Sequence, residues 1–234
     1  MSPKKRVIII TCVFIVTSII VNLTIIAYNG GFSNSNLVTP TGSQNLWKAG
    51  NNIKPGDFMV YELQTKDKQN NIQNRIVNIS FYYTPNEYWN TRFIISNQTG
   101  SSMKFVEKLS KSNLLVKDSD ERNKEYFKEI ETTILSIRDI TREQKYLIIG
   151  AQWDTISSGV STIPLKITSN EDLETPIGKV NAYVLNYKLN NTNNNIWISE
   201  KFPLPIKAEI HDEEGKIIFK YLIKNTNIKS SLKT

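Results

Sequence analysis

Few residues in this chain are suited to chemistry, and most of them lack the partners that catalysis needs. His211 is the single histidine and Cys12 the single cysteine. A Ser-His-Asp triad, a Cys-His pair or a zinc hydrolase site needs a histidine beside a nucleophile, an acid or further ligands. His211 stands on the polar side of an alternating pattern, next to a turn, so we expect it to face water. The sequence therefore predicts no metal, no cofactor and no histidine-based catalysis.

Acidic residues are the remaining candidates for catalysis, because two carboxylates alone can hydrolyse a glycoside. They form two groups, Glu171, Asp172 and Glu174, and Asp212, Glu213 and Glu214. Both groups fall in predicted turns, where acids are usually only solvated. A carboxylate-based hydrolase is therefore the least favoured function.

An apolar segment over residues 7–28 contains no charged residue. As a helix it measures about 33 Å, enough to cross a hydrocarbon core of about 30 Å. Lys4, Lys5 and Arg6 precede it and Tyr28 ends it. By the positive-inside rule the basic side stays in the cytoplasm, so we expect a single-pass protein whose remainder is extracytoplasmic.

A cleaved signal peptide is the alternative for this segment. Signal peptides share the basic start but carry a shorter apolar stretch and a small-x-small cleavage site. Residues 27–31 read AYNGG, which is a poor match. No lipobox precedes Cys12, so the sequence favours an uncleaved signal-anchor over both cleavage and lipidation.

The composition after the anchor is that of a folded domain. The chain is 39% hydrophobic and 10% aromatic, enough for a packed core. Its formal net charge is +7, of which three charges precede the anchor and the rest are spread among Lys-Glu mixtures. We expect no nucleic-acid partner. The expected organisation is a cytoplasmic tail (1–6), a transmembrane helix (7–28), a flexible stalk (29–46), an extracytoplasmic domain (47–225) and a tail (226–234).

Short alternating runs separated by turn residues predict an antiparallel sheet. Residues 179–189 are apolar on both faces, so this strand should be central. Residues 212–215 should form a tight hairpin into 216–223. The other expected strands are the runs 59–64, 77–83, 89–95, 163–167, 196–200 and 206–210.

One segment, 118–140, has the period of a helix. Asp118 and Glu121 resemble a capping box at its start. Its apolar stripe consists of Phe127, Ile130, Ile134 and Ile137. The predicted fold class is therefore mainly β with one amphipathic helix (α+β), in which a curved antiparallel sheet or half-barrel wraps around the helix.

Large aromatic residues are numerous and have two interpretations. Most should be core, but a curved sheet with more aromatic area than one helix can cover would leave an apolar hollow for a lipid or another hydrophobic ligand. The candidate lining residues are Trp89, Phe93, Trp153, Tyr183, Tyr187 and Trp197. Sequons at Asn78, Asn97 and Asn190 are candidate glycosylation sites, in numbers that chance explains.

The C-terminal third also carries a resemblance to a known family. Residues 175–183 read TPIGKVNAY, 197–199 WIS, 203–209 PLPIKAE and 215–221 GKIIFKY. This order resembles bacterial lipoprotein-carrier (LolA/LolB-like) half-barrels and, more closely, membrane-anchored archaeal proteins. The Pro55-Gly56-Asp57 turn fits the first strand of such domains.

The resemblance covers 47–223 loosely and 175–223 more closely, and its motifs specify turns and strand edges. It implies a convex antiparallel sheet around a helix, sometimes with a lipid-accepting cavity. Because this chain keeps an anchor, a freely diffusing shuttle is doubtful. The leading hypothesis is a non-enzymatic, membrane-anchored extracytoplasmic binding protein for a lipid or other hydrophobic ligand. The alternative is a structural or assembly component that binds another envelope protein.

Overall fold

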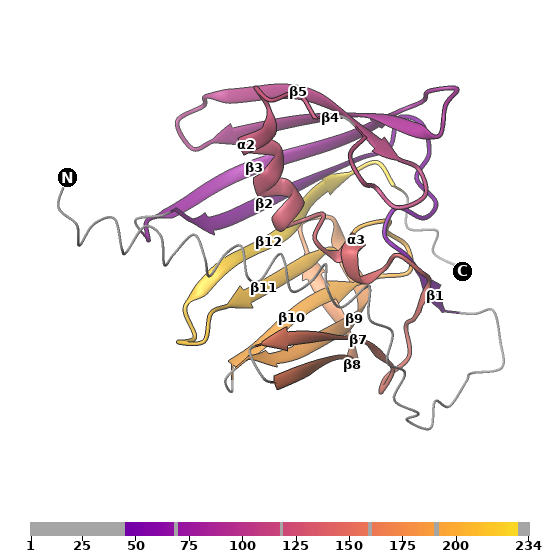
Figure 1. The fold of residues 1–234 in the computed structure, drawn as a ribbon, viewed down its shortest axis with the longest axis vertical. Coiled ribbons are helices and arrows are strands. Elements are labelled where there is room, and N and C mark those ends of the chain that lie inside the picture. The colour runs from indigo at the N-terminus through magenta and orange to yellow at the C-terminus, as the bar shows by residue number, and fades with distance from the viewer. Residues whose placement is uncertain (1–44, 68–69, 118, 159–160, 190–191, 229–234) are drawn as a thin grey trace. The chain divides into compact units, whose positions relative to one another are not determined.

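A computed structural model describes residues 45–67, 70–117, 119–158, 161–189 and 192–228 (Figure 1). Residues 44–154 and 165–234 form one compact unit, to which the packing below belongs. The second unit consists of 1–43 and 155–164. Its described residues are the last four of strand β7 and the first four of strand β8. The expected anchor at 7–28, with Lys4, Lys5, Arg6 and Tyr28, lies outside the described residues. Within the described ranges, no helix is long and apolar enough to cross a membrane.

The described elements are mostly strands, with two short helices between the fifth and sixth strands. They are β1 (Leu46–Trp47), β2 (Phe58–Lys66), β3 (Ile72–Tyr82), β4 (Tyr88–Asn97), β5 (Ser102–Ser110), α2 (Lys124–Thr132), α3 (Ile137–Ile140), β6 (Lys145–Tyr146), β7 (Gln152–Ser158), β8 (Ser161–Thr175), β9 (Gly178–Leu189), β10 (Thr192–Ile198), β11 (Lys207–His211) and β12 (Ile217–Thr226).

Ten of the strands form one sheet in the order β5-β4-β3-β2-β12-β11-β10-β9-β8-β7. The first meander, β2 to β5, starts at the centre of the sheet and ends at one edge. The chain then passes through α2 and α3, and the second meander, β7 to β12, returns from the other edge to pair β12 with β2. This topology places β5 and β7 at the two edges of an open sheet. The expected class, mainly β with helical structure on an antiparallel sheet, is confirmed.

Alternation along the early strands is confirmed residue by residue. Met59, Tyr61 and Leu63 on β2 are fully buried, whereas Glu62 between them is exposed. We call the face that carries these three residues the inner face. The prediction that Tyr83 lies within a strand is wrong, because Tyr83 lies beyond the end of β3 and is 65% exposed. The nearby Pro85 cannot donate a ladder hydrogen bond, which favours a loop at this point.

Strand β9 is central, as its apolar faces predicted. It lies between β8 and β10, and both faces contribute buried side chains, with Val184 on one and Leu185 on the other. The predicted hairpin at 212–215 is also confirmed. Gly215 adopts a φ of 77°, and its N–H donates to the carbonyl of Asp212 at 3.0 Å. The Asp212 carboxylate accepts the N–H of Lys216 at 2.8 Å, and backbone hydrogen bonding lowers the pKa of Asp212.

The single helix expected over 118–140 is wrong, because the segment forms two helices. Helix α2 ends at Thr132, and α3 covers only Ile137–Ile140. At the break, the hydroxyl groups of Thr132 and Thr133 donate to the carbonyls of Lys128 and Glu129. Threonine hydroxyls that bond back to the preceding turn compete with the helical ladder and weaken a helix end.

The predicted capping box is also wrong. Helix α2 begins at Lys124, and its N-cap residue Asn123 makes no side-chain capping hydrogen bond. Glu121 lies before the helix and pairs with Lys124 at 3.0 Å, while Asp118 lies outside the described residues. The apolar stripe is nevertheless buried in full, at Phe127, Ile130, Ile134 and Ile137. Burial therefore follows the periodic pattern across a break in the helix.

Helix α2 lies across the inner face of the first meander (Figure 1). Glu129 on its polar side forms an ion pair with Arg75 of β3 and accepts a hydrogen bond from Thr65 of β2 at 2.9 Å. Phe127 on its apolar side contacts Phe93 of β4. The helix is thus fixed to three neighbouring strands.

Several further features were missed or misplaced by the sequence patterns, among them the following. Leu46, expected in the stalk, begins β1, which pairs with β6. Strand β5 was not predicted. The predicted turn at 171–174 is wrong, because these residues lie within β8 and the turn follows at 175–178.

Candidate binding surfaces

A cluster of three phenylalanines occupies the inner face beneath α2. Phe93 stacks on Phe105 of β5 with ring centroids 5.2 Å apart. Phe127 of α2 meets Phe93 edge to face, with centroids 5.5 Å apart and planes at 67°. Phe93 is fully buried and Phe127 is 2% exposed. At this position the helix packs directly on the sheet, and Phe93, a candidate ligand-lining residue, is covered by the chain itself.

Trp89 is buried near the start of β4. Its ring meets Phe81 of β3 edge to face, with centroids 6.3 Å apart. The Lys111 amine lies 5.0 Å from the Trp89 ring centroid and 5.1 Å from that of Tyr83, and it donates to the carbonyl of Thr84 at 2.9 Å. Trp89 is therefore packed between Phe81 and the Lys111 side chain.

Trp153 lies against the β1–β6 pair rather than beside Phe93. Its ring stacks on Trp47 with centroids 6.0 Å apart. Trp153 Nε1 donates to the carbonyl of Tyr146 at 2.7 Å, and Trp47 Nε1 donates to that of Phe202 at 2.9 Å. Both indole donors are satisfied by backbone, as expected of structural tryptophans.

Tyr183, Tyr187 and Trp197 lie on β9 and β10, and the strand register divides them between faces. Tyr183 and Tyr187 have the same parity on β9, whereas Trp197 is paired with Val184, which has the opposite parity. Burial raises the pKa of Tyr187 to about 12. Trp197 Nε1 donates to the carboxylate of Glu171, and the Lys207 amine lies 4.1 Å from its ring centroid.

The six candidate lining residues therefore belong to several separate packing groups. Trp89 and Phe93 share β4, Trp153 belongs to the β1–β6 region, and Trp197 lies on the face of β10 opposite Tyr183 and Tyr187. A ligand role for any of them stays a prediction. A ligand at Phe93 would require α2 to leave the sheet.

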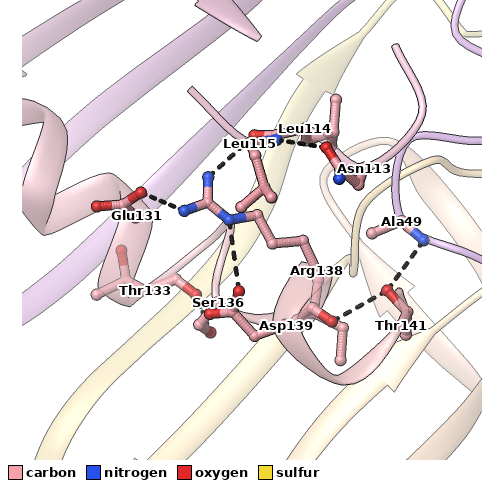
Figure 2. Close-up of polar contacts among 11 residues, drawn as sticks. Ala49, Asn113, Leu114, Leu115, Glu131, Thr133, Ser136, Arg138, Asp139 and Thr141 are labelled. Carbon is pink, nitrogen blue, oxygen red and sulfur yellow. Dashed lines mark hydrogen bonds and ion pairs between the residues drawn. The ribbon is translucent and has the colours of Figure 1, made fainter. Parts of the chain in front are cut away.

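A buried arginine holds the α2–α3 segment in place (Figure 2). The Arg138 side chain is 4% exposed and forms an ion pair with Glu131 of α2. Its Nη1 donates to the carbonyl of Leu114 at 2.9 Å, and its Nε lies 3.8 Å from an Asp139 carboxylate oxygen. Burial raises the pKa of Asp139, and the charge of Arg138 opposes this shift. Arg138 therefore joins both helices to the loop after β5.

The loop that Arg138 contacts is itself packed on the segment after β1. Leu114 has a φ of 57°, and its side chain lies against Gly50, where an added Cβ would be 2.9 Å from Leu114 Cγ. Thr141, just after α3, accepts the N–H of Ala49 at 3.2 Å (Figure 2). These contacts make α2 and α3 an integral part of the described domain.

A buried carboxyl lies on the inner face of β5, near the start of α2. Glu107 is 2% exposed, and Ser119 Oγ donates to it at 3.5 Å. Burial raises its pKa, while hydrogen bonds from Ser119 and Asn123 act in the opposite direction. Thr91 of β4, which pairs with Glu107 in the sheet, is fully buried. Its hydroxyl has no hydrogen-bond partner among the described residues. This corner of the core is polar and incompletely satisfied.

The outer edge of the sheet at β5 is only partly covered. The N–H of Lys117 donates to the carbonyl of Lys108 at 2.9 Å, and that of Ser110 donates to Leu115 at 2.8 Å. Alternate residues of an antiparallel strand direct both backbone polar groups to the same side. Ser102, Lys104 and Val106 therefore direct their N–H and C=O groups to the open edge. None of these groups has a backbone partner beyond β5 within the described residues.

Basic side chains surround this open edge. Strands β4 and β5 carry three exposed basic residues, Arg92, Lys104 and Lys108. Their only acid is Glu107, which points to the opposite face and is buried. Arg92 also lies over the Tyr82 ring at 4.6 Å. The outer surface beside β5 is thus positively charged without a neutralising acid on either strand.

The sequence patterns missed this surface because the alternation along β5 is imperfect. Phe105 and Leu109 are apolar and buried, but the position between them is Glu107. Val106, an apolar residue, is on the outer face and 53% exposed. Reading the flanking Phe105 and Leu109 at a spacing of four as one strand face would have found β5.

The two acidic groups considered for hydrolysis differ in position. Glu171 accepts from Trp197, while Asp172 points to the other face of β8 and pairs with Lys179 at 3.0 Å. Hydrogen bonds from Asn181 and Lys179 lower the pKa of Asp172. Asp212, Glu213 and Glu214 lie in the predicted turn, where Glu214 pairs with Lys216 at 2.6 Å.

His211 ends β11 and is half-buried rather than fully exposed. The backbone N–H of His211 donates to Asn194 Oδ1 at 2.6 Å. The ring Nδ1 is buried and has no hydrogen-bond partner in the described part of the chain. Across the same residues, no three His, Cys, Asp or Glu side chains gather as a metal ion would require.

The sequons occupy different environments. Asn78 lies on the outer face of β3, half-buried, and accepts from Ser80 Oγ at 2.9 Å. Asn97 is exposed at the end of β4, where its Oδ1 accepts three hydrogen bonds from Thr99 and Ser101. Asn190 lies outside the described residues. Their glycosylation stays a prediction.

A scan against models of protein families found no match, and a search of curated proteins found none. Similar solved structures include MucB, with a TM-score of 0.41 and 9% identity, covering 76% of this chain and 55% of MucB. Another is the MucA/MucB complex of Pseudomonas aeruginosa, with a TM-score of 0.36 and 9% identity, covering 73% of this chain and 51% of that chain. The chain thus spans about half the length of MucB.

A third similar structure is a domain from Vibrio parahaemolyticus described as an outer membrane lipoprotein-sorting protein. Its TM-score is 0.27 at 10% identity, covering 79% of this chain and 89% of that domain. A lipoprotein-sorting domain is thus among the similar structures. Scores and identities this low assign neither a family nor a function. Membrane anchoring and an archaeal origin stay predictions.

Proposed function

We propose that this chain is a non-enzymatic, membrane-anchored protein whose sheet domain lies outside the cytoplasm and binds a segment of another envelope protein. The observation that carries this proposal is the contact between Phe127 of α2 and Phe93 of the sheet, with ring centroids 5.5 Å apart. It fills the place where a lipid would have to bind under the helix. A protein partner needs no such hollow.

The attachment of α2 supports the same choice. The helix is joined to the sheet by the Glu129–Arg75 ion pair and to the β5 loop through Arg138. Opening a hollow would break these contacts and expose the stripe of buried apolar residues. If a lipid regularly entered beneath α2, we would expect fewer polar contacts between this helix and the rest of the domain.

Glu171 and Asp172 do not form a catalytic pair. An inverting or retaining glycosidase needs two acids facing one another across a substrate, about 5–10 Å apart. Glu171 and Asp172 lie on opposite faces of β8, and each is engaged by another side chain. The binding role therefore does not depend on a reaction.

Anchoring rests on the sequence. Residues 7–28 are long enough to span a bilayer, and Lys4, Lys5 and Arg6 favour a cytoplasmic start. An anchored domain works near its own membrane, where a tethered partner is present at high effective concentration. A modest contact surface is sufficient for such a partner.

Photo-crosslinking of the full chain in its native cells tests the choice of partner. A photoreactive phenylalanine analogue is placed at Phe127, or at one of three exposed positions, Tyr83, Val106 and Ile149, which are 65%, 53% and 61% exposed. We expect one recurring protein, identified by mass spectrometry, from at least one exposed position. We expect only intramolecular products from Phe127. Lipid adducts at Phe127 with no protein adduct elsewhere would instead establish the lipid-binding alternative.

Topology has its own test, which uses the single native cysteine. With Cys12 replaced by serine, a new cysteine at Ile149 should react with a membrane-impermeant maleimide in intact cells. The matched control, a cysteine at Ser2, should react only after lysis. Equal protection of both positions, or a mature chain that lacks residues 1–28, would refute the anchored arrangement.

A further inference from the structure

The edge of the sheet at β5 is a stretch of backbone that is prepared for pairing. Ser102, Lys104 and Val106 direct donors and acceptors away from β4, and the segment 115–117 covers only the end of the strand at Lys108 and Ser110. Unpaired edge groups of this kind bind an extended chain by strand addition. The covered end limits an incoming strand to the first half of β5.

Resting on the proposed protein-binding function, we propose that an extended acidic segment of the partner adds to the sheet along residues 102–106 of β5. Alternate residues of that segment would carry their carboxylates on the outer face, beside Lys104, Lys108 and Arg92. The remaining residues would continue the inner face next to Phe105. Main-chain hydrogen bonds supply affinity in this mode, and the alternate side chains supply specificity.

The basic surroundings indicate an acidic occupant. Exposed Arg92, Lys104 and Lys108 are the only charged residues on the outer face of β4 and β5. Lysines on an edge strand also discourage self-association, which is their ordinary structural role. An antiparallel pair of two β5 strands would bring lysines of the two copies into neighbouring positions, and like charges across strands are destabilising. A second copy of this chain is therefore a poor occupant.

The terminal segments of the chain are poor occupants as well. Residues 1–44 and 229–234 contain no aspartate or glutamate, and the latter segment reads KSSLKT. Neither can supply the complementary charge. We therefore assign the acidic strand to another protein.

Binding of a synthetic strand tests the inference on the full chain in nanodiscs. The probe is a fluorescein-labelled octapeptide of alternating glutamate and valine, followed by fluorescence anisotropy. Its control has the same sequence with N-methyl groups on alternate residues, which removes the donors needed for pairing but keeps the charge. We expect the first peptide to bind and the second to bind at least about tenfold more weakly, a difference of about 1.4 kcal/mol.

Two variants locate the site. Val106→Pro removes an N–H that faces the open edge and does not pair with β4, and Lys104→Glu reverses a charge beside it. Both should weaken binding about tenfold or more. Lys220→Glu is the matched control, because Lys220 is an exposed lysine in the middle of β12. It should change binding by less than about twofold.

Several results would overturn the inference. Equal binding of the N-methylated peptide, or equal loss in Lys104→Glu and Lys220→Glu, would show general charge attraction in place of strand addition. No binding of the unmodified peptide would refute it directly. Neither result refers to the proposed function, which fails separately if no exposed position crosslinks to a protein. A partner that crosslinks at Ile149 but not at Val106 would keep that function and reject this site.

Discussion

Replacing Phe127 by alanine tests whether α2 is part of the core or a cover over a ligand site. The ring is 2% exposed and lies edge to face against Phe93. Removing a buried phenylalanine ring destabilises a domain by about 3–5 kcal/mol. For a domain of this size each kcal/mol lowers the melting temperature by about 2–4 °C, so we expect a fall of about 10 °C.

Pulse proteolysis of the full chain in detergent micelles, across a urea series, measures this loss. Tyr126→Ala is the matched control, since Tyr126 is on the same helix and 38% exposed; it should change the free energy of unfolding by less than about 1 kcal/mol. Uptake of a fluorescent fatty acid is measured on the same samples. A loss below about 1 kcal/mol in Phe127→Ala, together with fatty-acid uptake by the wild-type protein, would refute the reasoning, because α2 would then be a loosely held lid.

Three further changes probe the contacts around α2, each followed by the free energy of unfolding. Arg138→Met should lower the free energy of unfolding by about 3 kcal/mol because it removes a buried ion-pair partner of Glu131. Adding Glu131→Gln should recover part of the loss. Full stability of the single variant would contradict the conclusion that Arg138 joins both helices to the loop after β5. Gly50→Ala should be more destabilising than Gly56→Ala: both glycines have positive φ, near 86° and 88°, but only at Gly50 would the new Cβ meet Leu114, and equal losses would exclude that steric contribution. Glu107→Gln should gain stability relative to the wild type as pH rises from the ordinary glutamate pKa of 4.5 through the raised pKa of Glu107. The raised pKa of Glu107 means that the folded state holds its proton more tightly, so wild-type stability falls as pH rises through that window; a pH-independent difference would contradict this.

The strands and the buried helical stripe could be predicted because each depends on local periodicity. Met59, Tyr61 and Leu63 lie on the strand face opposite Glu62 and Gln64, and strand β9 is apolar on both faces, so both patterns indicated burial directly. The break in the helix could not be predicted in this way. The stripe continues through Ile134 and Ile137, while the break depends on hydroxyl groups that compete for main-chain carbonyls.

The candidate site was largely hidden from the sequence for two physical reasons. Glu107 occupies an inner position of β5 and Val106 an outer one, which disrupts the alternation that identifies a strand. An open edge is also a property of strand order. Nothing local to residues 102–110 indicates that the chain leaves the sheet there and returns at the opposite edge through β7.

The dispersal of the candidate lining residues follows from the same limit. Composition shows that the chain has many large aromatics, but it does not show which of them share a face. The register places Trp197 opposite Tyr183 and Tyr187, and the β1–β6 pair takes Trp153 into a separate stack with Trp47. Aromatic content alone therefore does not identify which of these rings could line one shared surface.

The most direct test of the central claim is to identify which molecule, if any, is bound to the domain when it is purified from its native cells. A protease site introduced within residues 36–41 would let the folded domain be cut from the proposed anchor after purification from native membranes. Native mass spectrometry would then measure the mass of the domain together with any bound molecule. The account predicts the mass of the polypeptide alone, or of the polypeptide with one protein partner. A lipid retained in one-to-one ratio with the domain would contradict it.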